Sequence, residues 1–73
     1  MYEQLRALFV ARRRELKLTQ AAVARAMGTT QSAVSDLERG HTKDPCIATL
    51  ARWAFALELE LTIGVREAQE GAA

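Results

Sequence analysis

The order of hydrophobic and polar positions in residues 18–40 predicts two short helices joined by a tight turn. Thr19 and Thr30 are good N-caps, because a threonine hydroxyl accepts a hydrogen bond from a free amide one turn into a helix. Gly28 and Gly40 stand where these helices must end, since glycine adopts the left-handed cap conformation at little cost. The apolar positions form two narrow stripes that can face each other: Val23, Ala24, Met27, Val34 and Leu37. The pattern is that of a helix-turn-helix unit.

Further helices are predicted on both sides of this unit. Residues 2–17 contain strong helix formers and an apolar stripe at Leu5, Leu8, Phe9 and Leu16. After Gly40 comes the polar loop HTKDP, in which Pro45 fits the first position of a helix and Asp44 its cap. Apolar residues at helical spacing then follow: Ile47, Leu50, Trp53, Ala54 and Leu57. We therefore expect four helices around one core.

The pattern changes at Glu58. In residues 58–65, ELELTIGV, the apolar side chains Leu59, Leu61, Ile63 and Val65 occupy every second position, as in a strand. No other segment resembles a strand, and an unpaired strand leaves its amides and carbonyls open. Three interpretations remain: antiparallel pairing with the same strand of a second copy, addition of a partner protein to the edge, or a frayed extension of the preceding helix. Phe55 lies off the apolar stripe and is either plain surface or part of a subunit contact.

The chain therefore divides into a helical domain at 1–57, a strand at 58–65 and a flexible tail at 66–73. A chain of 73 residues forms one small domain that buries only about 60% of its unfolded surface, so it often gains from dimerising. No apolar run approaches the ~20 residues of a membrane span, and the amino terminus lacks a secretory pattern. We expect a cytoplasmic protein with no membrane partner.

Charge is distributed unevenly, although the net charge is only +1. Residues 12–44 contain seven basic and four acidic side chains, whereas residues 58–73 contain four acidic side chains and one arginine. A basic body with an acidic end suits a polyanion on one face, and a solvated charged surface is the alternative. At 3.6 residues per turn, the run Arg12 to Arg14 points to different sides of its helix, so we expect one of the three to face inward.

The chain is poorly equipped for catalysis. A lone His41 and a lone Cys46 are too few for a zinc site, which needs four ligands or three and a water. Cys46 near a helix start is either a small, partly buried residue, which we favour, or a redox sensor with a lowered thiol pKa. We expect no enzyme activity, no metal, no cofactor and no small-molecule ligand.

Polar residues at the start of the second helix of the unit suit double-stranded DNA. A recognition helix presents its first residues to base edges while the preceding helix crosses the backbone. Candidates for base reading are Gln31, which can contact adenine, Ser32, Ser35, and Asp36, which can accept from a cytosine amino group. Candidates for phosphate contacts border the same face: Gln20, Thr30, Arg39, Thr42 and Lys43. The alternative is that these polar side chains only keep a surface helix soluble.

The segment LTQAAVARAMGTTQSAVSDLERG, followed by HTKDP, resembles the Cro/repressor-type helix-turn-helix family, also called the XRE family. The resemblance covers about residues 5–57 and implies an all-α, lambda-repressor-like bundle of four helices. It implies that Gln31, Ser32 and Asp36 read bases and that Gln20 contacts phosphate.

The resemblance also implies an ion pair between Arg13 and Glu38, which makes Arg13 the arginine that faces inward. Phage repressors often carry glutamine where this chain has Ser32 and Asp36, so their operator sequence does not transfer. The ending ALELELTIGV, with Glu58 where the family usually has glycine, is more similar to small antitoxins of the HigA and HipB kind.

The sequence thus predicts a homodimer that binds a palindromic operator and represses transcription, with recognition helices about 34 Å apart. The first hypothesis is an autoregulatory antitoxin at the nucleoid with a cognate toxin. The second is a stand-alone phage-type repressor or a restriction–modification controller, and the third a protein-interaction module that captures a toxin. The predicted dimer interface consists of Phe55, Leu59, Leu61, Ile63 and Val65.

Overall fold

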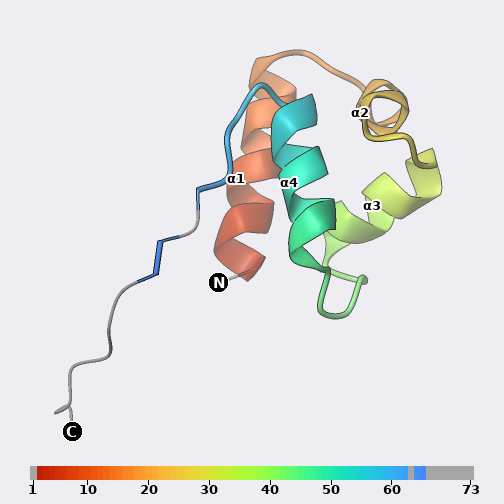
Figure 1. Cartoon of the computed structure of the whole chain (residues 1–73). Coiled ribbons are helices and arrows are strands. Elements are labelled where there is room, and N and C mark those ends of the chain that lie inside the picture. Colours follow the sequence, from red (N-terminus) through yellow and green to blue (C-terminus); the bar gives the residue numbers. More distant parts are fainter. Residues whose placement is uncertain (1, 63, 66–73) are drawn as a thin grey trace, which may run out of the picture.

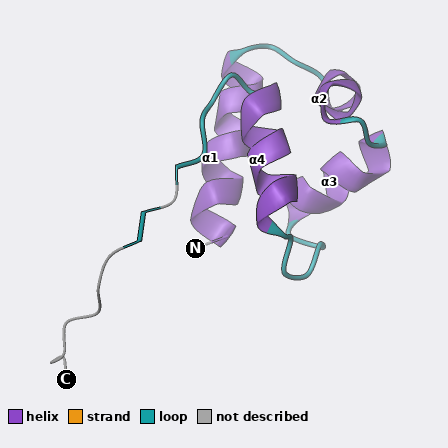
Figure 2. Cartoon of the chain, viewed as in Figure 1, coloured by secondary structure: helices purple, strands orange, loops and turns teal. Residues whose placement is uncertain are grey.

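Four helices build the domain. The computed structural model describes residues 2–62 and 64–65, and its helices are α1 (Tyr2–Glu15), α2 (Gln20–Met27), α3 (Gln31–Arg39) and α4 (Ile47–Ala56). Figure 1 shows α2 and α3 together on one side of α4, with α1 on the other side and the segment after α4 leading away from α2 and α3. Figure 2 shows that the described residues outside these helices are loops and turns. The predicted bundle of four helices is confirmed.

One apolar core holds the helices together. Its buried members are Phe9, Val23, Ala24, Met27, Val34, Leu37, Trp53, Ala54 and Leu57. All five residues predicted to be buried in the helix-turn-helix unit are among them. The rings of Phe9 and Trp53 join α1 to α4 in an edge-to-face contact with centroids 4.8 Å apart, a favourable arrangement for two aromatic rings.

Two predicted core residues are at the surface instead. Leu8 is 56% exposed, because the core side of α1 is centred on Phe9, and Leu8 lies to the side in a surface hollow with Leu59. Ile47 is 61% exposed, because it is the first residue of α4 and the core begins further along that helix. Helical spacing predicted these two incorrectly, since it shows which residues share a stripe and not how wide the buried stripe is.

Threonine hydroxyls cap the two central helices as predicted. Thr19 Oγ1 accepts from the Ala22 amide at 3.0 Å at the start of α2. Thr30 Oγ1 accepts from the Ala33 amide at 3.1 Å at the start of α3. Each bond satisfies a donor that the helix leaves free, so the first turns of α2 and α3 are both stabilised by their caps.

All four helices end with backbone hydrogen bonds that return to the last turn. Gly28 and Gly40 close α2 and α3 with φ of 75° and 77°, as predicted. Lys17 and Glu58 take the same left-handed conformation after α1 and α4, with φ of 59° and 61°. A side chain in this conformation costs about 1 kcal/mol or more, so these two ends are strained relative to a glycine.

The start of α4 was predicted incorrectly. The helix begins at Ile47 with Cys46 as its N-cap, and the Cys46 side chain makes no cap hydrogen bond. Asp44 has a φ of 47° and therefore turns the loop instead of capping a helix. Pro45 lies before the helix instead of at its first position, and Cys46 is exposed, not partly buried.

The segment after α4 is neither helix nor strand in residues 58–62 and 64–65. Because α4 ends at Ala56, the interpretation as a helical extension is wrong. Leu59 and Leu61 are half-buried and pack against the core of their own chain. Pairing with a second copy stays a prediction, and Ile63 and the predicted tail at 66–73 lie outside the described residues. None of the described helices is both long and apolar enough to span a membrane.

Candidate nucleic-acid interface

Helix α3 presents a polar face to solvent. Val34 and Leu37 bury one side of the helix in the core. On the other side Gln31 and Ser32 are exposed and Ser35 is half-buried. The predicted base-reading side chains of the first turn therefore project from a helix whose position is fixed by its opposite side.

A nearly buried carboxylate ties α3 to α1 and α2. Arg13 Nε donates to Glu38 Oε2 at 2.6 Å and Arg13 Nη2 donates to Glu38 Oε1 at 3.1 Å. The two side chains are 15% and 7% exposed. Arg13 Nη1 also donates to the Leu18 carbonyl at 2.9 Å, so the guanidinium bonds both its partner and the chain between α1 and α2. The structure thus forms the ion pair that the resemblance implies, and Arg13 faces inward as expected. Arg12 is also half-buried and donates to the Leu57 carbonyl, so two of the three arginines, not one, make contacts within the fold.

Gln20 has a partner that sequence reasoning missed. Its Nε2 donates to Glu38 Oε1 at 2.9 Å, and the residue is half-buried at the start of α2. An amide nitrogen carries two hydrogens, so one remains for the phosphate oxygen that we predicted as its contact. No periodic pattern links residues 20 and 38, and only the packing of α2 on α3 brings them together.

The other predicted phosphate ligands lie at the two ends of α3 and in the loop that follows it. Arg39 ends α3 and Lys43 lies in the following loop, and both are exposed. Within the described residues neither forms a salt bridge, so each cation is available to a phosphate. The Thr30 hydroxyl accepts a hydrogen bond as the cap of α3, which leaves its own hydrogen to donate. Thr42 is half-buried.

A family model described as "Helix-turn-helix" matches residues 10–63, well over half of the chain. The chain belongs to the helix-turn-helix family. No curated protein and no solved structure matches it. The matched segment contains Arg13, Glu38 and the whole exposed face of α3. The match supports a DNA-binding regulator of the Cro/repressor type.

Asp36 of this helix-turn-helix protein has a basic neighbour that the sequence did not indicate. His41 Nδ1 lies 4.0 Å from Asp36 Oδ1, and the His41 amide donates to the Asp36 carbonyl at 2.8 Å. The turn that Gly40 makes after α3 brings the two together. A protonated His41 would compete with a cytosine amino group for the Asp36 carboxylate.

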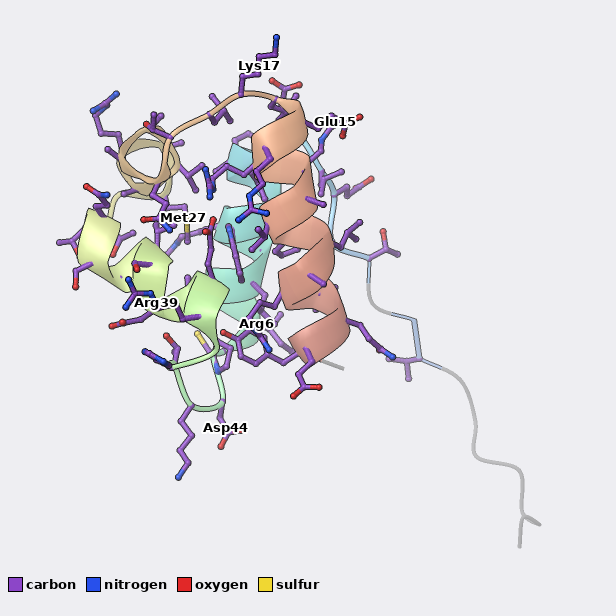
Figure 3. The ribbon with its side chains drawn as sticks, turned by 180° about the vertical axis from the view of Figure 1, so that it is seen from behind. Arg6, Glu15, Lys17, Met27, Arg39 and Asp44 are labelled. Atoms are coloured by element: carbon purple, nitrogen blue, oxygen red, sulfur yellow. The ribbon has the colours of Figure 1, made fainter. Side chains whose placement is uncertain are left out.

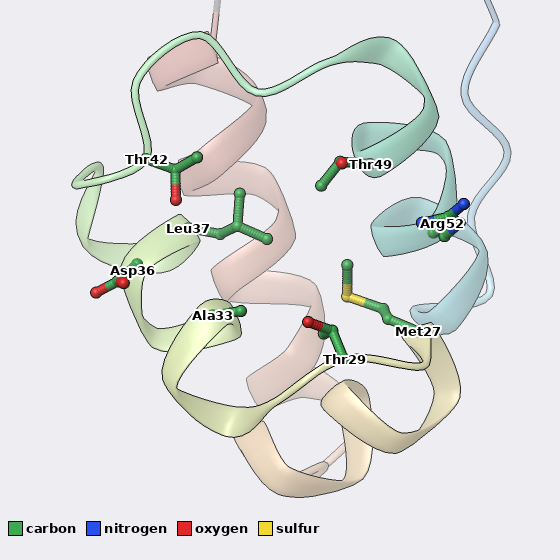
Figure 4. Close-up of a pocket in the computed structure, with 8 residues that line it drawn as sticks. All are labelled: Met27, Thr29, Ala33, Asp36, Leu37, Thr42, Thr49 and Arg52. Atoms are coloured by element: carbon green, nitrogen blue, oxygen red, sulfur yellow. The ribbon is translucent and has the colours of Figure 1, made fainter.

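A shallow hollow of about 270 Å³ lies beside this face of the helix-turn-helix protein (Figure 4). It is lined by residues of α2, α3, α4 and the loops between them: Met27, Thr29, Ala33, Asp36, Leu37, Thr42, Thr49 and Arg52. Figure 4 shows the carboxylate of Asp36 and the guanidinium of Arg52 at its two ends, both directed away from its centre. The hollow therefore presents mainly apolar groups and threonine hydroxyls.

The exposed thiol of Cys46 lies at the start of α4. Cys46 Sγ is 3.3 Å from Thr49 Oγ1. This hydrogen bond, helped by backbone amides of the same turn, lowers the pKa of the Cys46 thiol.

Proposed function

We propose that this helix-turn-helix protein is a sequence-specific transcriptional repressor that binds a palindromic operator as a homodimer. The observation that carries the proposal is the exposed first turn of α3, with Gln31 and Ser32 free, on a helix whose last turn is held through Glu38. A base-reading helix needs side chains without partners on its exposed face and close packing on its opposite face. The exposed Arg39 and Lys43 supply cations at the border of that face.

The homodimer is proposed on the basis of the apolar surface around the end of α4. Phe55 is 81% exposed, and it lines a groove together with Ala51 and residues 58–61. Antiparallel pairing of residues 58–65 across a two-fold axis would cover this surface and would give backbone partners to the part of the segment that follows Leu59, whose own amide is bonded to α4. Two recognition helices would then face successive turns of the duplex, about 34 Å apart.

Within this proposal, the first hypothesis is the autoregulatory antitoxin of a toxin–antitoxin pair. A stand-alone phage-type repressor or a restriction–modification controller is the second, and a toxin-sized reading frame beside the gene separates the two. The same groove at Phe55 also favours a candidate of another class, a protein-interaction module whose apolar surface captures a toxin. Co-purification of the native protein distinguishes these, because a captured toxin and bound DNA are both detected.

The experiment that tests base reading starts with selection of a preferred duplex from a random DNA library. Gln31→Ala should then weaken binding to the selected duplex by about 1–3 kcal/mol and relax the preference at one position. Gln4→Ala is the matched control, because Gln4 is an exposed glutamine on α1. Equal weakening by Gln31→Ala on selected and random DNA would contradict base reading. A Gln31→Ala, Ser32→Ala variant that loses DNA but still neutralises a toxin would show that the two activities are separable.

A further inference from the structure

The first turns of α1 contact the last turn of α3. Tyr2 Oη donates to the Leu37 carbonyl at 2.6 Å, and Arg6 Nη1 donates to the Glu38 carbonyl at 3.3 Å. The last carbonyls of a helix have no partner within the helix. The Leu37 carbonyl accepts from the Gly40 amide at 3.3 Å as well as from Tyr2, whereas the donor to the Glu38 carbonyl is Arg6. A guanidinium at this end also interacts favourably with the helix dipole.

The contact is closely packed. Arg6 and Tyr2 are both half-buried, and the Arg6 guanidinium carbon lies 5.9 Å from the centre of the Tyr2 ring. A Cβ atom at Gly40 would lie 3.0 Å from the same carbon of Arg6, so the end of α3 approaches Arg6 as closely as a glycine allows. Figure 3 shows Arg6 between α1 and the lower end of α3.

The recognition helix is therefore held at two levels. The Glu38 side chain is bound by Arg13 and Gln20, and the backbone of the same turn is bound by Tyr2 and Arg6. The side-chain bonds fix the rotation of α3, and the backbone bonds fix the place of its last turn. With nine residues, α3 is about 13 Å long at 1.5 Å per residue, so a tilt at its last turn displaces the first. Hydrogen bonds to base edges weaken steeply when their geometry changes.

We infer that Tyr2 and Arg6 are positioning residues for DNA recognition: they hold the last turn of α3 so that its first turn meets the bases in register. The inference rests on the proposed function of α3 as the base-reading helix. Neither residue touches DNA in this role. Their loss should reduce discrimination between sequences more than it reduces general affinity, because phosphate contacts tolerate a small tilt better than base contacts do.

Arg12 provides a control for stability. Its Nε donates to the Leu57 carbonyl at 3.1 Å, which is the same kind of bond from the same helix but made to the end of α4. Arg12→Met therefore removes an arginine–carbonyl contact without touching α3. Tyr2→Phe and Arg6→Met remove the two contacts to α3 and keep most of the apolar part of each side chain.

The test compares dissociation constants for a duplex selected by the wild-type protein and for a random duplex of equal length. Tyr2→Phe and Arg6→Met should each lower the ratio of the two affinities by about fivefold, the size expected for loss of one hydrogen bond. Arg12→Met should leave the ratio unchanged. An unchanged ratio in Tyr2→Phe and Arg6→Met, or an equal drop in Arg12→Met, overturns the positioning role. If the wild-type protein selects no duplex, the proposed function fails instead.

A measurement on the protein without DNA decides the inference independently. Amide hydrogen exchange at Gly40 and His41, whose amides close the end of α3, should be faster in Tyr2→Phe and Arg6→Met than in Arg12→Met.

Tyr2 is the single tyrosine of the chain, so its ionisation can be followed by absorbance. Burial raises the pKa of Tyr2 and the charge of Arg6 lowers it, so Arg6→Met should raise this pKa further. Unchanged exchange, or an unchanged Tyr2 pKa in Arg6→Met, overturns the contact.

Discussion

Gln20 and Glu38 meet at 2.9 Å, where the first side chain of α2 donates to the carboxylate near the end of α3. Arg13 of α1 donates to the same carboxylate oxygen at 3.1 Å. Three helices therefore converge on one nearly buried anion. The charge of the Glu38 carboxylate is balanced only while Arg13 is present, because removing one partner of a buried ion pair leaves the other charge without compensation.

Glu38→Ala should lower the free energy of unfolding by about 3 kcal/mol or more, since it leaves the Arg13 guanidinium unpaired among half-buried groups. Urea denaturation followed by circular dichroism measures this. The double variant Arg13→Met, Glu38→Leu should recover much of the loss, because it removes both charges. If the double variant is as unstable as the sum of the single ones, the two residues are not coupled.

Glu58→Gly should raise the free energy of unfolding by about 0.5–1 kcal/mol. Glu58 closes α4 with a φ of 61°, a conformation that costs a side chain more than it costs glycine. Glu60→Gly is the matched control: Glu60 is an exposed glutamate of the same segment without a positive φ, so its replacement should bring no gain. A loss of stability in Glu58→Gly would show that the glutamate side chain makes a compensating interaction.

Lys43→Ala should weaken binding to all duplexes alike and reduce by about one the slope of log affinity against log salt concentration, since one phosphate contact is lost. A salt titration of the DNA dissociation constant measures the slope. Arg14→Ala, at an exposed cation of α1, is the control for net charge. An unchanged slope in Lys43→Ala would remove this residue from the phosphate ligands.

Deletion of residues 58–73 should convert the proposed dimer to a monomer, measured by light scattering. The full-length variant Phe55→Asp should weaken the proposed dimer as well, because it places a charge at the exposed apolar surface without removing core residues. Circular dichroism on both proteins verifies that the four helices remain. A truncated protein that stays dimeric refutes pairing through this segment.

The Cys46 thiol should react with iodoacetamide at lower pH than a free cysteine does. The hydrogen bond with Thr49 lowers the pKa of the thiol, so the reactive thiolate forms at lower pH. Thr49→Val removes the hydroxyl, and the pH at half-maximal alkylation rate should therefore rise. If that pH stays the same in Thr49→Val, the bond does not control the thiol.

The helix-turn-helix unit was predictable from sequence because the signals that define it are local. Thr19 and Thr30 cap helices through amides three residues away, and Gly28 ends a helix by its own φ angle. The stripe residues Val23 and Val34 follow helical spacing, which holds whatever the helix packs against. These features depend on short stretches of chain, so reading along the sequence finds them.

The tertiary structure decided which residues from distant parts of the chain come into contact and how wide the buried face of each helix is. It gave Gln20 its partner Glu38, brought Tyr2 to a carbonyl 35 residues away, and left Leu8 at the surface although its spacing suited the core. No periodicity records such pairs, because they arise only when the helices pack. The sequence by itself thus determined the four helices and the exposed polar side chains of the first turn of α3, and the packing of α1 against α3 decided how the last turn of that helix is held.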